Sequence, residues 1–158
     1  MSNLQNTITN KIVLFSLDEP RYALYLSAVE RVIRSLEITP LPKAPEKVLG
    51  VINLQGKIIP VIDIRKLFRL PTREINLEDL FIIAKTSQQT IALVVDSVEG
   101  VSEVSNYQIT DAKEILRVTD YLSGITVFEN NIILINDLEK FLSLKEQQVL
   151  DKALNQNI

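Results

Sequence analysis

The sequence predicts a mainly β protein made of two small β-barrels of about five strands each, with short helices and a helix at the C-terminus. Many short apolar runs follow one another along the chain, and short turn segments separate them. This pattern is typical of small barrels rather than of a parallel sheet. The second observation is an internal repeat, because self-similarity at a long period indicates a duplicated structural unit.

The repeat consists of two blocks in the same order. The aligned segments are 50–65 with 124–139, at a shift of 74 positions, and 23–32 with 92–101. In the first block Gly50 meets Gly124 and Asp63 meets Asp137. The alternative explanation is that β-rich segments resemble one another through composition alone.

The whole chain, residues 1–158, is expected to be a single domain built from two repeat halves. The halves span about 11–70 and 79–142, the polar connector 71–78 divides them, and 143–158 forms the C-terminal helix. Duplication then gives two compact barrels that share an apolar interface. Exchange of strands between the barrels stays open.

In the first half, apolar runs and period-two alternation predict strands joined by tight turns. The expected strands are 11–17, 22–26, 51–54 and 58–62, with a less regular segment over 29–36, and the expected helices are 46–49 and 64–68. Pro45 suits the first turn of the earlier helix. Gly56 supplies the positive φ of a two-residue turn after Gln55, and Asp63 stands where a helix cap belongs.

In the second half the same reasoning predicts two hairpins and two helices. The expected strands are 80–84, 90–95, 101–104, 121–128 and 132–135. Gly100 is expected to break the chain before the third of these strands. Asp137 opens a helix through Leu142, and residues 144–154 form a C-terminal helix that docks or projects.

The composition excludes much chemistry. The chain has 158 residues, of which 46% are hydrophobic, and it has no His and no Cys. It therefore lacks the commonest general base, the usual transition-metal ligands and a thiol nucleophile. No stretch approaches the roughly 20 apolar residues of a membrane span, the N-terminus lacks signal-peptide features, and the absence of cysteine fits a reducing compartment. We expect a cytoplasmic protein.

Charge is distributed unevenly, although the net charge is only −3. Residues 20–75 include ten basic and five acidic side chains, whereas residues 76–158 include six basic and thirteen acidic ones. A basic half and an acidic half favour head-to-tail association with similar modules. The alternative is that both are solvated faces without a partner.

Three aspartates follow apolar strands, as catalytic or metal-binding carboxylates often do: Asp63, Asp96 and Asp137. A carboxylate there also accepts hydrogen bonds from free N–H groups at the start of a helix. Two of the three occupy the same place in the repeat, which favours capping. No phosphate-binding glycine motif occurs, so we expect no catalytic set, no cofactor and no metal.

Residues 50–65 resemble the signature stretch of CheW-like proteins, the adaptors of bacterial chemotaxis arrays. Further matches lie around Val29, at 91–98 and at 121–124, so that the resemblance covers about residues 11–142. It implies two SH3-like five-stranded β-barrels and no enzymatic activity. Family members bridge the regulatory domain of the histidine kinase CheA to the cytoplasmic tip of a chemoreceptor. The resemblance thus implies recruitment to membrane-associated receptor arrays without membrane insertion.

The resemblance places the partner-binding residues beside a groove between the barrels: Val29, Arg31, Asn53, Gln55 and Gly56. Two of them depart from the family pattern. The family usually has arginine where Gln55 stands, and glutamine lacks both its charge and its bidentate fork. The family commonly has glutamate where Arg31 stands. Val29 has an alternative role in the core, and Asn53 has one in satisfying the turn backbone.

Several functional hypotheses remain from the sequence. The first is an adaptor between a CheA-like kinase and a chemoreceptor, and the two departures also favour an adaptor of a divergent pathway that controls pili or another output. An SH3-like barrel that binds nucleic acid through its basic half would show strongly salt-dependent affinity. A hydrolase would lose turnover when one of the three aspartates is removed.

Overall fold

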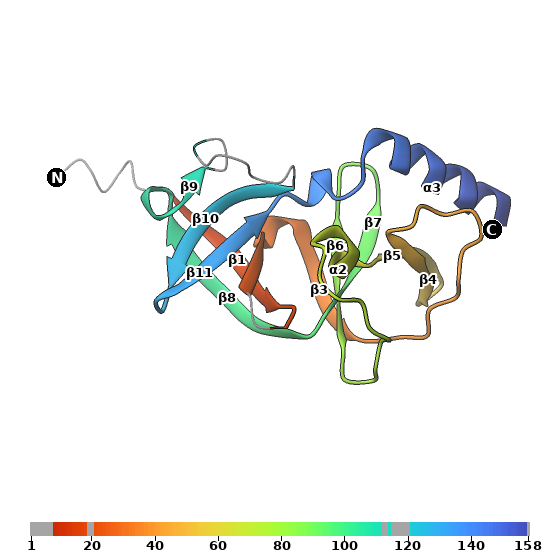
Figure 1. Ribbon diagram of the computed structural model, residues 1–158, viewed down its shortest axis with the longest axis horizontal. Coiled ribbons are helices and arrows are strands. Elements are labelled where there is room, and N and C mark those ends of the chain that lie inside the picture. Colours follow the sequence, from red (N-terminus) through yellow and green to blue (C-terminus); the bar gives the residue numbers. More distant parts are fainter. Residues whose placement is uncertain (1–7, 19–20, 112–113, 115–120, 158) are drawn as a thin grey trace.

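The computed structural model describes residues 8–18, 21–111, 114 and 121–157 and shows two β-sheets side by side (Figure 1). The terminal sheet has the strand order β8-β1-β2-β11-β10-β9, and the central sheet has the order β3-β6-β7-β5-β4. The terminal strands are β1 (Thr9–Ser16), β2 (Arg21–Tyr25), β8 (Ser97–Ser105), β9 (Thr110–Asp111), β10 (Leu122–Phe128) and β11 (Asn131–Asn136). The central strands are β3 (Val29–Arg34), β4 (Val48–Leu54), β5 (Lys57–Ile62), β6 (Leu80–Lys85) and β7 (Thr90–Val95).

The helices are short except at the C-terminal end of the chain. They are η1 (Leu26–Ala28), α2 (Ile64–Leu67), η2 (Asn106–Gln108), η4 (Leu138–Lys140) and α3 (Leu144–Asn157). The mainly β fold with a C-terminal helix is therefore confirmed.

Both sheets have the same internal arrangement. In each sheet, one antiparallel hairpin pairs with the remaining strands through a single parallel pair of strands. The hairpin β1–β2 does so because β2 runs parallel to β11, and the hairpin β6–β7 does so because β7 runs parallel to β5. The β1–β2 hairpin comes from the first sequence half but lies in the terminal sheet, whereas β6–β7 comes from the second half and lies in the central sheet. Each sheet thus combines strands from both halves. The duplication that would explain this symmetry stays a prediction.

Two glycines at matched positions allow the sheets to close into barrels. In the central sheet, Thr39 lies beyond β3 and exchanges two backbone hydrogen bonds of 2.8 Å with Val51 of β4. The segment that follows β3 at one edge of the sheet therefore pairs with β4 at the other edge. A Cβ on Gly50 would lie 2.2 Å from the Thr39 carbonyl oxygen, and its φ of +154° also favours glycine. In the terminal sheet, a Cβ on Gly124 would lie 2.9 Å from the Thr110 carbonyl oxygen of β9.

Among the described residues, the hydrophobic core has three parts. One fills the terminal barrel (Ile12, Leu14, Ala23, Val104, Ile133 and Ile135), and one fills the central barrel (Ile52, Ile59, Val61, Phe81, Ile83 and Ala92). The largest cluster, here called the shared core, takes residues from both barrels and from α3, among them Phe15, Leu24, Ile62, Leu93, Phe141 and Leu150.

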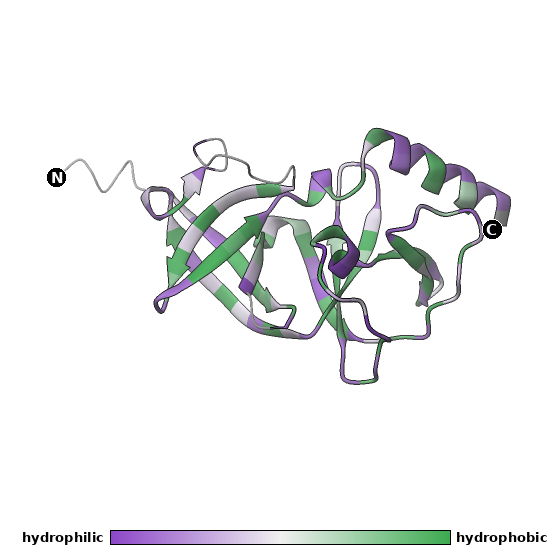
Figure 2. Ribbon diagram, in the orientation of Figure 1, coloured by the Kyte–Doolittle hydropathy of each residue, from purple (hydrophilic) through white to green (hydrophobic). Residues whose placement is uncertain are grey.

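Strands at the junction are buried on both faces. On β6, Phe81 and Ile83 point into the central barrel, while Ile82 and Ala84 join the shared core. This explains why β6 has a continuous apolar run rather than an alternating one. In α3, by contrast, hydrophobic and hydrophilic residues alternate along the helix (Figure 2).

The C-terminal helix docks rather than projects. Leu150 and Ala153 of α3 are buried in the shared core. At its start the Glu146 N–H donates to Ser143 Oγ at 3.1 Å, and the Ser143 N–H donates to Glu146 Oε1 at 2.8 Å, which is a capping box. In the part of the chain that the structure describes, no helix is long and apolar enough to cross a membrane.

Three local predictions were wrong. The helix expected over 46–49 is a turn, because the Val48 N–H closes it on the Pro45 carbonyl at 2.9 Å and Val48 then pairs with β5. The helix after Asp137 is only the three-residue η4. The less regular segment over 29–36 contains the strand β3, whose pairing with β6 shifts in register between Val29 and Arg31. Gly100 does not break the chain: β8 runs through it, and its φ of +116° accommodates a bulge opposite β1.

Candidate partner-binding site

The tip of the β4–β5 hairpin holds three of the five predicted partner-binding residues. Gln55 and Gly56 have φ values of 55° and 90°, the two positive values that a type I′ turn requires. The Asn53 side chain accepts a hydrogen bond of 2.8 Å from the Gly56 N–H. All three residues are exposed. Asn53 therefore stabilises the turn, which is the alternative role expected for it from the sequence. The tip is a solvent-facing turn closed by this hydrogen bond.

The other two residues lie at the start of β3. Val29 pairs with Ala84 of β6, is half-buried and packs against the shared core. Arg31 pairs with Ile83 and is exposed. Among the residues that the structure describes, the Arg31 side chain has no hydrogen bond or ion pair. Its guanidinium group is thus exposed and available to a partner.

The five predicted residues consequently form two groups. β3 and β4 are the first and last strands of the central sheet, and the groups lie at the start of one strand and at the end of the other. Within the described part of the chain, no hydrogen bond joins the pair Val29 and Arg31 to the turn at Gln55.

A charged network ties the two barrels together, and the sequence reasoning missed it. Arg65 of α2 is buried and donates to the carboxylate of Asp18, beyond β1, at 3.0 Å and to that of Asp96, between β7 and β8, at 2.8 Å. Arg73 pairs with Asp96 at 2.5 Å and with Asp79 at 2.7 Å. The sequence contains one relevant signal, which is that Arg65 aligns with the oppositely charged Glu139 in the repeat.

The network keeps the carboxyl groups of Asp79 and Asp96 ionised. Burial raises the pKa of Asp96, but the hydrogen bond from the Asp18 N–H and the guanidinium groups of Arg65 and Arg73 outweigh burial, so this pKa lies below its ordinary value. The hydrogen bond from Arg73 lowers the pKa of Asp79 in spite of burial. These groups are fixed in ion pairs and are not poised to exchange protons at neutral pH.

The three candidate aspartates divide into two caps and one ion-pair partner. Asp63 accepts a hydrogen bond from the Arg65 N–H at 3.1 Å, and Asp137 accepts one from the Glu139 N–H at 3.0 Å, which confirms both as caps. Asp96 caps no helix, because β8 follows it. Across the described residues, no group of three or more His, Cys, Asp or Glu is arranged to hold a metal ion.

Comparison with known proteins decides the family. The model of the CheW-like domain matches residues 11–146 of this chain. The chain belongs to the CheW-like family. Chemotaxis protein CheW of Klebsiella aerogenes is 27% identical over 149 residues, which cover 93% of this chain and 90% of that protein. Chemotaxis protein CheW of Bacillus subtilis is 30% identical over 140 residues, which cover 87% and 90%.

A solved structure agrees. The crystal structure of the scaffolding protein TtCheW from Thermoanaerobacter tengcongensis matches with a TM-score of 0.79 and 33% identity, and the match covers 88% of this chain and 96% of that one. These similarities extend over both barrels and confirm the resemblance seen in the sequence. This member of the CheW-like family is accordingly an adaptor of chemotaxis-type signal transduction.

Proposed function

We propose that this chain is a non-enzymatic adaptor that couples a CheA-like histidine kinase to the cytoplasmic tip of a chemoreceptor, and that it is recruited from the cytoplasm to membrane-associated receptor arrays. The observation that carries the proposal is the family match across residues 11–146, which spans both barrels. The ionised, arginine-paired carboxylates described above support a structural rather than a catalytic role.

Partner binding in this proposal uses Val29, Arg31, Asn53, Gln55 and Gly56. The exposure of the four residues other than Val29 and the hydrogen bond within the β4–β5 turn support this assignment, because a preorganised loop loses little entropy on binding. Arg31 and Gln55 carry the specificity, since both differ from the family pattern. A partner adapted to this chain then offers a group complementary to a cation at Arg31 and to an uncharged amide at Gln55.

Calorimetric titration tests the assignment, with the kinase regulatory domain and the receptor tip encoded beside this gene. The double variant Arg31→Glu/Gln55→Arg restores the family pattern and should weaken binding to a co-adapted partner by about 1–3 kcal/mol. The variant Lys145→Glu/Gln148→Arg makes the same kinds of change on the exposed face of α3 and should bind as the wild type does.

The possible outcomes test the site assignment and the adaptor proposal separately. Unchanged binding of both partners to Arg31→Glu/Gln55→Arg would contradict the site assignment alone. Failure of the wild-type chain to bind either partner would contradict the adaptor proposal itself. Because the two residue groups are separate in the structure, the single variants also reveal whether Arg31 and Gln55 serve the same partner or different ones.

The alternative from the sequence is an adaptor of a divergent pathway that controls pili or another output. Deleting the gene and measuring swimming and pilus-dependent motility distinguishes the two outputs. A defect confined to swimming would exclude the divergent pathway.

A further inference from the structure

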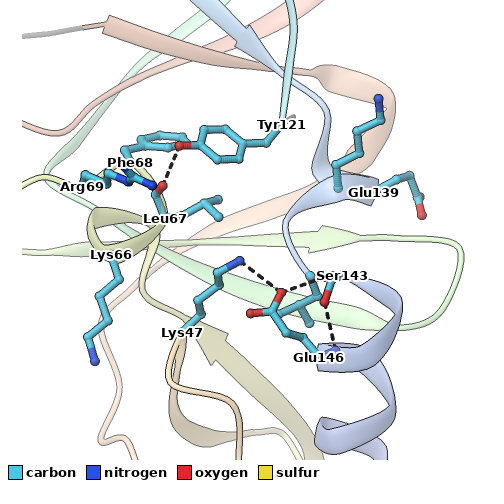
Figure 3. A pocket seen from close by; sticks show the side chains of 11 residues that line it. Lys47, Lys66, Leu67, Phe68, Arg69, Tyr121, Glu139, Ser143 and Glu146 are labelled. Atoms are coloured by element: carbon cyan, nitrogen blue, oxygen red, sulfur yellow. Dashed lines mark hydrogen bonds and ion pairs between the residues drawn. The ribbon is translucent and has the colours of Figure 1, made fainter. Parts of the chain in front are cut away.

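A pocket of about 820 Å³ opens between α2, η4 and the start of α3 (Figure 3). None of the five predicted partner-binding residues lines it. Its volume lies within the range of about 300–1,000 Å³ that small-molecule sites occupy. The pocket is therefore a concave site distinct from the proposed adaptor surface, and its size suits a compact ligand.

Basic side chains outnumber acidic ones around this pocket. It is lined by the cations Lys47, Lys66, Arg69 and Lys140 and by the carboxylates Glu139 and Glu146. Both carboxylates already have partners within the chain. Glu139 accepts hydrogen bonds of 2.8 Å from the Ser87 N–H and hydroxyl, and Glu146 pairs with Lys47 at 3.1 Å. The field in the pocket consequently favours an anion.

Two of the cations have no partner among the described residues. The Lys66 ammonium group donates to the Glu46 carbonyl at 3.2 Å, but the side chains of Arg69 and Lys140 have neither a hydrogen bond nor an ion pair in the described part of the chain. Both are exposed and line the pocket. An arginine fork and an ammonium group together are the usual donors to phosphate oxygens.

Arg69 also has an unfavourable backbone conformation. Its φ is 59°, in the left-handed region, and the bonds from the Leu70 N–H to the Arg65 carbonyl and from the Arg69 N–H to the Lys66 carbonyl form a Schellman motif. Glycine is the usual residue at this place because a Cβ is disfavoured there. Arginine at this position therefore costs stability, and its side chain makes no hydrogen bond or ion pair within the described chain that offsets the cost.

Aromatic rings form one wall of the pocket. Phe68 and Tyr121 lie together, with ring centroids 5.2 Å apart, and the Tyr121 hydroxyl donates to the Leu67 carbonyl at 2.6 Å (Figure 3). This hydrogen bond holds the tyrosine ring in place. A fixed aromatic wall next to unpaired cations suits a ligand that combines a flat ring with anionic groups.

We propose that this pocket binds a phosphorylated small molecule of about nucleotide size, with its phosphate oxygens on Arg69 and Lys140 and its ring against Phe68 and Tyr121. The proposal is independent of the adaptor function, and either can fail without the other.

Calorimetric titration of the full chain with ATP, tripolyphosphate and adenosine tests it. We expect ATP to bind with a Kd of about 100 μM or tighter, tripolyphosphate to bind more weakly and adenosine most weakly. Arg69→Gly and Lys140→Gln should each weaken ATP binding about tenfold. Lys85→Gln, which removes an exposed cation of β6 outside this pocket, should leave binding unchanged.

Arg69→Gly also distinguishes a ligand contact from a structural role. Because glycine relieves the positive φ, this variant should raise the melting temperature by about 2–4 °C while it weakens ATP binding. Absence of saturable binding of both ATP and tripolyphosphate up to about 10 mM would overturn the proposal. So would an equal loss of ATP binding in Lys85→Gln, which would indicate nonspecific attraction by charge.

Discussion

The two barrels are joined by matched contacts that differ in chemistry. Arg65 of α2 holds the carboxylate of Asp18 beyond β1, and Glu139 of η4 accepts two hydrogen bonds from Ser87 between β6 and β7. Arg65 aligns with Glu139 at the shift of 74 positions, and Asp18 precedes β2 as Ser87 precedes β7. The fold determines which positions meet, but the chemistry of the contact can differ. Arg65 and Asp18 form an ion pair, whereas neutral groups of Ser87 donate to the Glu139 carboxylate.

The hairpin tips show the same separation between geometry and chemistry. Both have two successive positive φ values, at Gln55 and Gly56 in the central barrel and at Glu129 and Asn130 in the terminal barrel. A two-residue hairpin demands this geometry. The tips differ in what they expose, because Val127 and Ile132 pair across the terminal hairpin and are 60% and 63% exposed. Shared features thus reflect the fold, and differences mark candidates for function.

Barrel closure gives the largest expected effect. Gly50→Ala places a Cβ 2.2 Å from a backbone oxygen that cannot move away, and we expect a loss of about 4 kcal/mol in the free energy of unfolding. Gly124→Ala should cost about 2 kcal/mol, because its Cβ would lie 2.8 Å from the Ile109 methyl group and 2.9 Å from the Thr110 oxygen. Urea unfolding of both variants measures the difference. Equal losses would contradict the tighter closure of the central barrel.

The matched contacts give the next effect. Arg65→Ala removes the buried cation that pairs with Asp18 and Asp96, and it should lower the free energy of unfolding by about 3 kcal/mol. Glu139→Ala removes exposed hydrogen bonds from Ser87 and should cost about 1 kcal/mol. The comparison uses urea unfolding under the same conditions. A loss in Glu139→Ala as large as that in Arg65→Ala would show that the contact matters more than its charge.

Features that depend on local spacing could be predicted from the sequence. The two-residue turn at Gln55 and Gly56 and the caps at Asp63 and Asp137 follow from residues a few positions apart, and the two caps also occupy matching places in the repeat. The mainly β class followed because short apolar runs cannot form long helices.

Features that depend on distant partners could not be predicted. Asp96 resembles the two caps by its position after an apolar strand, but its partners are Arg65 and Arg73, 31 and 23 positions away. The expected helix at 46–49 failed because Val48 gains more by pairing with Ile62 and joining the shared core than by continuing the turn from Pro45. For the same reason, the separation of Val29 from the turn at Gln55 could not be inferred before the strand order was known.

Acid should weaken the ion-paired side of the junction. The folded-state pKa values of Asp79 and Asp96 lie below their ordinary values, so these carboxylates contribute stability at pH above about 4, and the contribution is lost as pH falls through the folded-state pKa values. Glu146, whose pKa is also lowered, adds to the effect. We expect the urea midpoint to fall between about pH 5 and pH 3, and to fall less steeply in Asp96→Asn. Identical slopes in the two proteins would show that Asp96 is not a source of acid sensitivity.

Helix capping gives the smallest effect and tests whether the matched aspartates are purely structural. Asp63→Ala should cost about 1–2 kcal/mol and Asp137→Ala about 0.5–1 kcal/mol, because Asp63 is buried and Asp137 is half-buried. Asn retains the side-chain oxygen that accepts the N–H, so Asp63→Asn should be nearly neutral and serves as the control. Urea unfolding with and without added divalent metal measures all three variants. If the added metal stabilises the wild-type chain but not Asp63→Ala, the carboxylate is a ligand, and the symmetry of the two caps is a coincidence of position.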